Sequence, residues 1–447
     1  MLRFAMLVGL LALAVAAWGQ EAAAPVGAVL TLEQAVALAI QNNRQVHNAA
    51  LEVGKKTDQV AAARTHLLPT FNVYLLESYL LTPIEFTFPQ GAFGTFPNTG
   101  PIPSKDTTLK TAQHPTTAVF AQATQPLSQL YRIGLNVQLQ KVGESVAHEE
   151  LRLRRQSIVH DVKQLYYGIL QTLSGVEALD VTLQSYRELD RLVTGYVREQ
   201  KALKADSLEV KTRLAKSEYD LLTLRHTLAS QQEQLNNLMG IEIDAVFRVT
   251  PVPDAMPEPM DQTAASARAL AQRPELKEAR LKVRQAEYDR RMKLAEYIPN
   301  VSLAFTYFSP VDVDLVPKNI TTVGVLLTWD VFDWGRKKRE AAEKGKTVAQ
   351  ARTTVSDTEN AILLDVRSRL RTVQEKAALL RVHRLAQETA QEKLRVAMDK
   401  YAQQAALLQD VLQAQASLAD ANQQYQQGLS SFWSARADVA KALGEEE

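Results

Sequence analysis

The sequence has 447 residues, with 51 Lys and Arg against 50 Asp and Glu, so its formal net charge is +1. This balance gives no basic or acidic field that would favour nucleic acid or another polyanion as a partner. The sequence contains no cysteine, which excludes disulfides, thiolate metal sites, a thiol nucleophile and a lipid attached through an N-terminal cysteine.

The N-terminus, residues 1–19, predicts a cleaved signal peptide. Arg3 supplies a short positive region, and the apolar stretch Phe4–Ala17 is too short to span a membrane comfortably. Small residues at Ala17 and Gly19 then precede a possible cut. A membrane anchor is the alternative. No later stretch approaches the ~20 apolar residues of a spanning helix, so we expect an exported mature chain without transmembrane helices.

The chain is predicted to be a tandem repeat of one structural unit. Asp206 matches Asp410 at an offset of 204, and Pro69 matches Pro299 at an offset of 230. The difference of 26 places one insertion in the first copy, between about residues 82 and 115. The resulting division is a first copy at 20–249, a Pro-rich linker at 250–262, a second copy at 263–444 and an acidic tail at 445–447.

Helix-forming segments dominate each copy. In the first, Thr31 and Gln34 resemble a capping box that opens an Ala-rich helix running to about His66. The segment from about 128 to 200 has no proline and predicts a helix of roughly 110 Å at 1.5 Å per residue. A return helix at 206–239 follows. Together the opening and return helices match the long helix in length, so they can lie end to end along it in a cylinder wall.

Two strands interrupt the helices of each copy, near 70–80 and 116–127 and near 300–309 and 320–332. The strands of the second copy alternate most clearly, and their apolar faces comprise Val301, Leu303, Phe305, Tyr307, Val323, Val325, Leu327 and Trp329. This pattern is typical of lipid-facing positions in a membrane β-barrel, while a soluble sheet with one buried face is the alternative. Four strands alone would leave two open edges in lipid, so we expect the barrel to be shared between chains.

The loop between the first two strands is unusually long. Residues 83–103 hold five prolines among glycines and phenylalanines, which indicates a loop and not a core element. It is longer than its counterpart near 310–319. Because it lies on the side of the strands opposite the helices, we expect it to face the cell exterior.

The sequence shows no catalytic, metal or cofactor constellation. Its seven histidines are scattered, and His160 and His383 are interpreted as helix-surface residues. The basic run Arg336–Arg339 begins a helix beside the strands. A solvated face is the simple interpretation of that run, and contact with phospholipid or lipopolysaccharide is the alternative.

Several motifs, in order and partly duplicated, carry a resemblance that covers nearly the whole mature chain. They are Leu-Glu-Gln-Ala-Val-Ala-Leu-Ala at 32–39, Arg-Pro-Glu-Leu at 273–276, Tyr-Ile-Pro at 297–299, Trp-Asp-Val-Phe-Asp-Trp-Gly-Arg at 329–336 and Ala-Leu-Gly at 442–444. In these motifs the chain resembles the TolC-like outer-membrane efflux proteins. The resemblance implies a mixed α and β membrane protein with long α-helical coiled-coil hairpins and four antiparallel transmembrane β-strands per chain. It also implies a homotrimer with a twelve-stranded β-barrel and a twelve-helix periplasmic tunnel.

The resemblance further implies an exit duct without enzymatic activity or a cofactor. Such ducts reside in the outer membrane with a large periplasmic portion, and dock onto a periplasmic adaptor and an inner-membrane pump or exporter. They serve tripartite efflux pumps or type I secretion, and contact outer-membrane lipid. The alternative is a soluble periplasmic coiled-coil adaptor or scaffold, although an adaptor normally has one helical hairpin between β-domains.

The turns between long and return helices are expected to form the periplasmic end of the tunnel. There Asp206 and Glu209 occupy the same places as Asp410 and Gln413. One interpretation is a pair of capping boxes with the aspartates at N-cap. The other is a gate, because the resemblance implies an aspartate at the Asp410 position lining the closed entrance. The second aspartate of the family is Gln413 here, and a basic partner found in some members is Ala406.

Overall fold

The computed structural model of the chain divides into two compact units. They are Met1–Val53 with Val146–Arg280 and Thr353–Glu447, and Gly54–Ser145 with Leu281–Arg352. The structure describes residues 29–79, 81–83, 85–110, 115–200, 203–252, 260–311, 317–403 and 405–446. The predicted signal peptide and the centre of the predicted linker therefore lie outside the described residues. In the described part of the chain, no helix is both long and apolar enough to cross a membrane.

The opening helix of the first copy begins at the predicted capping box. Thr31 Oγ1 accepts from the Gln34 backbone N–H at 3.2 Å, and Gln34 Oε1 accepts from the Thr31 N–H at 3.0 Å. The predicted single helix to His66 is wrong in one respect, because it is interrupted at Asn43. The observed elements are β1 (Val29–Leu30), α1 (Leu32–Asn42) and α2 (Arg44–Thr65).

The second copy repeats this interruption. Its opening helices are α5 (Gln262–Gln272) and α6 (Pro274–Ala295), with the break at Arg273. Asn43 has φ −65° and ψ 125°, and Arg273 has φ −59° and ψ 126°. The two copies therefore share one backbone geometry at the break, formed by two different side chains.

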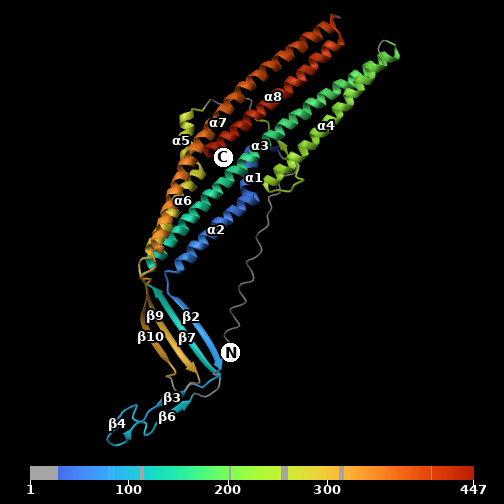
Figure 1. Ribbon diagram of the computed structural model, residues 1–447. Coiled ribbons are helices and arrows are strands. Elements are labelled where there is room, and N and C mark those ends of the chain that lie inside the picture. Colours follow the sequence, from blue (N-terminus) through green and yellow to red (C-terminus); the bar gives the residue numbers. More distant parts are fainter. Residues whose placement is uncertain are drawn as a thin grey trace. The chain divides into compact units, whose positions relative to one another are not determined.

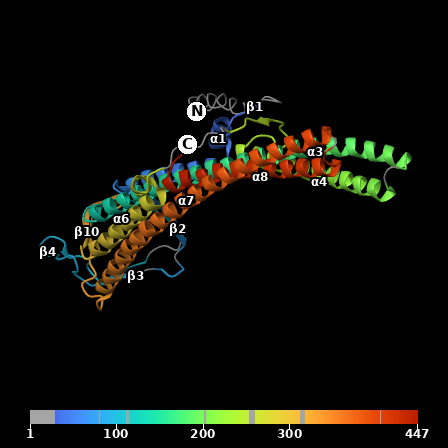
Figure 2. The ribbon, with the colours of Figure 1, turned by 90° about the horizontal axis from the view of Figure 1, so that it is seen from above.

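Each copy continues into a long hairpin. The helices are α3 (Leu130–Arg198) and α4 (Lys204–Met239) in the first copy, and α7 (Arg336–Ala402) and α8 (Leu408–Leu443) in the second. The 69 residues of α3 correspond to about 100 Å of helix. The members of each hairpin run side by side (Figures 1 and 2), linked by polar contacts such as Gln387 Nε2 to Asn422 Oδ1 at 2.8 Å.

The helical unit is held by apolar clusters at matching places in the two copies. In the first copy, Ala35, Ala39, Val46, Ile158, Val162, Tyr166, Leu235 and Met239 are buried together. The corresponding residues of the second copy are Ala265, Ala269, Leu276, Ile362, Val366, Leu370, Val439 and Leu443. Only Tyr166 brings a polar atom to its set. Its hydroxyl lies 2.9 Å from the Leu30 and Thr250 carbonyl oxygens, beside the parallel pair of β1 and β8 (Arg248–Val249).

A glycine ends the return helix of each copy. Gly240 and Gly444 have φ of 68° and 85°, the left-handed conformation that glycine adopts without strain. A Cβ on Gly240 would lie 2.5 Å from the Asn42 carbonyl oxygen, whereas one on Gly444 would lie 3.1 Å from the Arg273 nitrogen. Each glycine therefore lets the end of a return helix approach the break in the opening helix of the same copy.

The second unit contains an antiparallel sheet with strand order β10-β9-β7-β2. Its strands are β2 (Thr70–Tyr79), β7 (Pro115–Pro126), β9 (Asn300–Val311) and β10 (Ile320–Thr328). The last strand is shorter than the predicted 320–332. Thr328 pairs with Asn300, the first residue of β9. Asn300 is preceded by Pro299, which has no N–H to extend the ladder.

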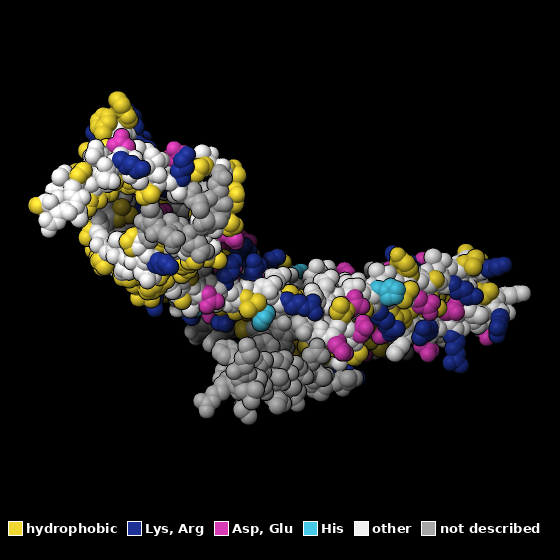
Figure 3. Space-filling view, turned by 90° about the horizontal axis from the view of Figure 1, so that it is seen from below, with side chains coloured by type: hydrophobic (Ala, Val, Ile, Leu, Met, Phe, Trp, Pro, Cys, Tyr) yellow, Lys and Arg dark blue, Asp and Glu magenta, His cyan; other side chains and the backbone are white. Residues whose placement is uncertain are grey.

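The strand register places the predicted apolar residues of β9 and β10 on one face. Val323 lies opposite Phe305 and Val325 opposite Leu303. Facing residues of antiparallel strands share a side of the sheet, so the same face continues through Ala123 of β7 to Phe71 of β2. The space-filling view shows hydrophobic side chains along the outer rim of this curved sheet (Figure 3).

The predicted loop at 83–103 lies within a region that contains two short ladders. They are β3 (Glu85–Phe88) with β6 (Thr107–Lys110), and β4 (Thr95–Phe96) with β5 (Gly100–Pro101). An ion pair between Glu85 and Lys110 and a bond from the Gln90 N–H to Asp106 Oδ1 at 2.8 Å support this arrangement. The insertion of the first copy thus forms two short two-stranded sheets of its own.

Candidate functional site

The two predicted gate aspartates lie in the first turns of the return helices. Asp206 Oδ2 accepts from the Leu203 N–H at 3.0 Å, and Asp410 Oδ2 accepts from the Leu407 N–H at 2.9 Å. Both aspartates are therefore at N3, and the predicted N-cap position is wrong. The helices begin three residues earlier than expected because Leu203 and Leu407, which offer no side-chain acceptor, occupy the cap and the aspartates satisfy its N–H.

The other two candidates differ between the copies. Glu209 forms an exposed ion pair with Arg213 one turn along α4, at 2.6 Å. Gln413 is exposed, and its backbone carbonyl accepts from Ser417 Oγ at 2.9 Å. The first hairpin thus carries a paired charge at this position, and the second carries a neutral amide.

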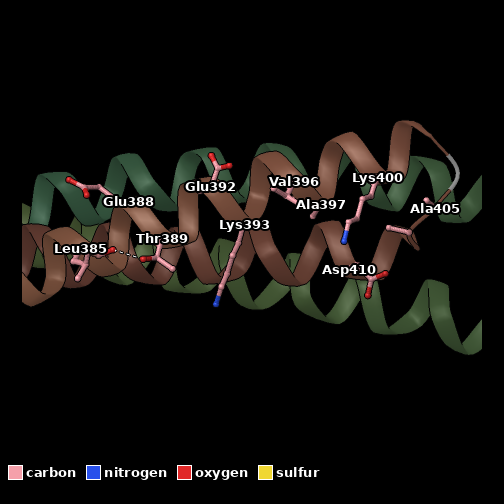
Figure 4. Close-up of a pocket in the computed structure, with 11 residues that line it drawn as sticks. Leu385, Glu388, Thr389, Glu392, Lys393, Val396, Ala397, Lys400, Ala405 and Asp410 are labelled. Carbon is pink, nitrogen blue, oxygen red and sulfur yellow. Dashed lines mark hydrogen bonds between the residues drawn. The ribbon is translucent and has the colours of Figure 1, made fainter.

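Asp410 borders a groove of about 770 Å³ along the end of the second hairpin. Figure 4 shows Lys400 of α7 on the same side of the hairpin as Asp410 of α8. Its lining also includes Glu388, Glu392, Lys393, Val396 and Ala397, so both signs of charge occur beside apolar side chains. These α7 residues were not predicted from the sequence, because their place beside the same groove as Asp410 depends on how α7 and α8 pair.

Two clusters of polar side chains, one at each helix break, were also not predicted from the sequence. At the second break, Arg273 forms ion pairs with Glu275 and Asp365, both at 2.9 Å. Burial opposes the charge of Arg273, but these carboxylates outweigh it and hold the pKa of Arg273 above its usual value. At the first break, the Asn43 side chain accepts from the Gln45 N–H at 2.8 Å and donates to the Leu238 carbonyl at 2.9 Å. The Arg-Pro motif at 273–274 was a signal for such a break.

The interpretation of His160 as a surface residue is also wrong. Its Nε2 lies 2.7 Å from Asp438 Oδ1, and the ring is largely covered. Asp438 in turn accepts from Arg369, which also pairs with Asp365. His160 therefore belongs to a structural polar network between α3, α7 and α8. No group of three or more metal-ligating side chains occurs among the described residues.

The candidate lipid-facing residues lie together in the sheet unit. Leu303, Phe305, Val323, Val325 and Leu327 are exposed in the single chain, and they share one face of β9 and β10. Val301 and Tyr307 of the same face are half-buried. Trp329 is exposed but lies just beyond the end of β10. A contiguous exposed apolar face marks a surface that contacts another protein, a membrane or a ligand.

Known protein families and solved structures include ones that are similar to this chain. The family described as outer membrane efflux protein matches residues 35–241 and 265–445. No curated protein matches the chain. The solved structure of CusC is similar, with 16% identity and a TM-score of 0.75, over 93% of this chain and 92% of that chain. The CmeC outer membrane channel of Campylobacter jejuni has 15% identity and a TM-score of 0.75, over 92% and 85% of the two chains.

The open state of the MtrE outer membrane channel of Neisseria gonorrhoeae is also similar, with 15% identity and a TM-score of 0.72, over 93% of this chain and 89% of that chain. At these identities the likeness concerns the fold, and it confirms the predicted class of long helical hairpins with four antiparallel strands per chain. The family match covers both copies and does not favour the adaptor alternative. The chain belongs to the outer membrane efflux protein family.

Proposed function

We propose that this chain is the outer-membrane exit duct of a tripartite efflux pump or a type I secretion system. Three copies form one duct, with a twelve-stranded barrel in the outer membrane and a helical tunnel in the periplasm. A periplasmic adaptor and an inner-membrane pump or exporter deliver the substrate. The duct performs no chemistry and needs no cofactor.

One observation carries this proposal, namely a four-stranded sheet with an apolar face and two unpaired edges. Among the residues that the structure describes, β2 pairs only with β7 and β10 only with β9. Unpaired N–H and C=O groups are not tolerated in the hydrocarbon of a bilayer. Pairing β10 of one copy with β2 of the next removes every edge when three copies close a ring. It also presents Val301, Leu303, Phe305, Tyr307, Val323, Val325, Leu327 and Trp329 to lipid.

Cysteine scanning tests this pairing directly, because the chain has no native cysteine. One cysteine replaces Asn72 in β2, and a second replaces Thr322, Gly324 or Leu326 in β10. We expect oxidation in membranes to give covalent dimers and trimers for at least one pair. The control pair Thr306→Cys and Thr322→Cys faces within one chain and should close only intrachain. Monomers alone, or recovery in the soluble periplasm, would contradict the proposal.

The insertion of the first copy gives the proposed orientation. The region with β3–β6 joins β2 to β7 at the strand ends opposite α2 and α3, so it faces the cell exterior if the helices are periplasmic. A tag at Gly94 should react with antibody on intact cells. Reaction only after rupture of the outer membrane would invert the topology.

We also propose that Asp410 contributes to the periplasmic gate. In a trimer three copies of Asp410 ring one axis, and like charges held close attract cations. Asp206, Glu209 and Gln413 are the further candidates. Asp410→Asn retains a side-chain oxygen for the Leu407 N–H, so it separates gate from cap. We expect altered cation selectivity or cation block in planar bilayers, and unchanged selectivity and block in a folded trimer would leave Asp410 as a helix cap.

A further inference from the structure

The segment from Trp329 to Arg339 carries aromatic and basic side chains beyond the last paired residue of the sheet, Thr328. It follows β10 and exposes large apolar side chains, with Phe332 at 72% and Trp334 at 87% exposure. Their rings meet edge to face with centroids 4.8 Å apart. Trp334 has φ +57°, a left-handed conformation that is unfavourable for a bulky residue. The backbone thus holds an aromatic pair outward.

The turn that presents this pair is fixed by its own side chain. Asp333 accepts from the N–H groups of Gly335 and Lys337, both at 3.0 Å. Gly335 also has a positive φ, of 80°. Asp333 therefore accepts from N–H groups at the start of α7 that would otherwise be available to a ligand. A partner that binds this surface would contact its side chains and not the helix terminus.

Two of the four following cations have no partner in the described part of the chain. Arg336 pairs with Glu340 at 3.2 Å, and Lys337 is buried with its Nζ 3.4 Å from the Asp330 carbonyl. Lys338 and Arg339 are exposed and form no hydrogen bond or ion pair within the described ranges. Cations in the first turn of a helix oppose its dipole, so these two residues do not serve the stability of α7.

The equivalent segment of the first copy lacks this surface. At the offset of 204, Ile133, Gly134 and Leu135 stand where Lys337, Lys338 and Arg339 stand. Leu135 is buried. There Ser128 anchors the chain to the sheet, donating to the Pro299 carbonyl at 2.6 Å and accepting from the Val301 N–H at 2.8 Å.

We propose that Trp334, Lys338 and Arg339 form a binding surface for anionic phospholipid at the membrane edge nearest the helices. The inference rests on the proposed function. Along the chain an apolar strand face is followed by aromatic rings and then by unpaired cations. This order matches the hydrocarbon, the interface and the headgroup phosphates of a leaflet. Each cation near such a surface contributes about a fivefold gain in affinity.

The test uses the full chain, purified in detergent as the trimer and titrated with short-chain phosphatidylglycerol or phosphatidylcholine carrying brominated acyl chains. Quenching of tryptophan fluorescence gives an apparent Kd for each lipid. We expect the wild type to prefer phosphatidylglycerol by about tenfold or more. Lys338→Gln with Arg339→Gln should reduce this preference to about onefold. Trp334→Phe should weaken quenching by both lipids.

A matched control removes two cations farther along the same helix, Lys344→Gln with Lys346→Gln, and should keep the preference. Because Lys338→Gln with Arg339→Gln removes charges that oppose the helix dipole, its apparent Tm should not fall. An unchanged preference in that variant, or none in the wild type, overturns the inference. Competition by inorganic phosphate as strong as by the lipid would indicate an ordinary anion site and also overturn it. A duct that inserts and conducts but lacks the preference leaves the proposed function intact, whereas a chain that fails to form trimers contradicts the proposed function itself.

Discussion

The two breaks in the opening helices, one in each copy, are stabilised by different side-chain interactions. Asn43 is buried and acts through neutral hydrogen bonds to the Gln45 N–H and the Leu238 carbonyl. Arg273 acts through ion pairs with Glu275 and Asp365, whose carboxylates are about one third exposed. The backbone geometry is nearly identical. The position of the break is therefore common to both copies, whereas the side chain that stabilises the break differs between them.

The largest expected effect comes from the glycines that face the two breaks. Gly240→Ala should lower the free energy of unfolding by about 3 kcal/mol, because it combines a left-handed residue with a Cβ placed against backbone. Gly444→Ala should cost about 1 to 2 kcal/mol, since its Cβ has more room. Apparent Tm values of the detergent-solubilised variants give the comparison. A larger loss for Gly444→Ala would show that the two packing sites are not equivalent as described.

Substitution of the break residues tests the chemical difference itself. Asn43→Ala should cost about 2 kcal/mol, because it removes the cap of α2 and leaves the Leu238 carbonyl unpaired. Arg273→Met keeps the apolar stem and should cost about 1 kcal/mol at low salt. The shift in apparent Tm should shrink in 1 M NaCl for Arg273→Met only, because salt screens ion pairs at partly exposed carboxylates. Equal salt dependence of the two variants would remove the distinction.

A smaller effect is expected from the one polar side chain in the matched apolar sets. Tyr166→Phe should cost about 1 kcal/mol, because it removes the hydroxyl's hydrogen bonds with Leu30 and Thr250, while the Thr250 N–H keeps the Leu30 carbonyl as its acceptor at 3.1 Å. The control is Leu370→Met, a volume-conserving change at the equivalent position of the second copy, which should cost less. Apparent Tm is again the measurement, and no difference between the two would mean that the hydroxyl contributes nothing net.

The same region predicts a loss of stability in alkali. Burial raises the pKa of Tyr166, and burial raises the pKa of Tyr167 to about 12. Because the pKa of each tyrosine is higher in the folded chain than the value of about 10 in the unfolded chain, the neutral side chains stabilise the fold fully below about pH 10. This stabilisation is lost as the pH rises toward about 12. Apparent Tm measured across this range should fall less in Tyr166→Phe with Tyr167→Phe than in the wild type. Parallel curves would assign the alkaline loss to other groups.

The smallest stability change should come from the hairpin turns. Asp206→Asn and Asp410→Asn each retain an oxygen for the N–H of the preceding leucine, so we expect less than about 0.5 kcal/mol from the reduced interaction with the helix dipole. Asp206→Ala and Asp410→Ala lose the acceptor and should cost about 1 kcal/mol. A large loss in either asparagine variant would mean that the charge itself stabilises the turn.

Sequence patterns determined much of this protein, because they record local and repeated constraints. The offsets of 204 and 230 predicted two copies, and the period of two in β9 and β10 identified the apolar face that the register confirms. The pair Thr31 and Gln34 predicted the start of α1, since a capping box is contained within four residues. Proline-free stretches predicted the long helices.

Tertiary structure alone decided the features that depend on distant partners. The break at Asn43 depends on both kinds of contact, because its side-chain oxygen caps α2 locally through the Gln45 N–H, whereas its amide group donates to Leu238 at the distant end of α4. Lys400 joins Asp410 at one groove only through the pairing of α7 with α8. Local sequence patterns predict which segments form helices and strands, whereas long-range contacts determine where a helix is interrupted and which charged side chains lie together.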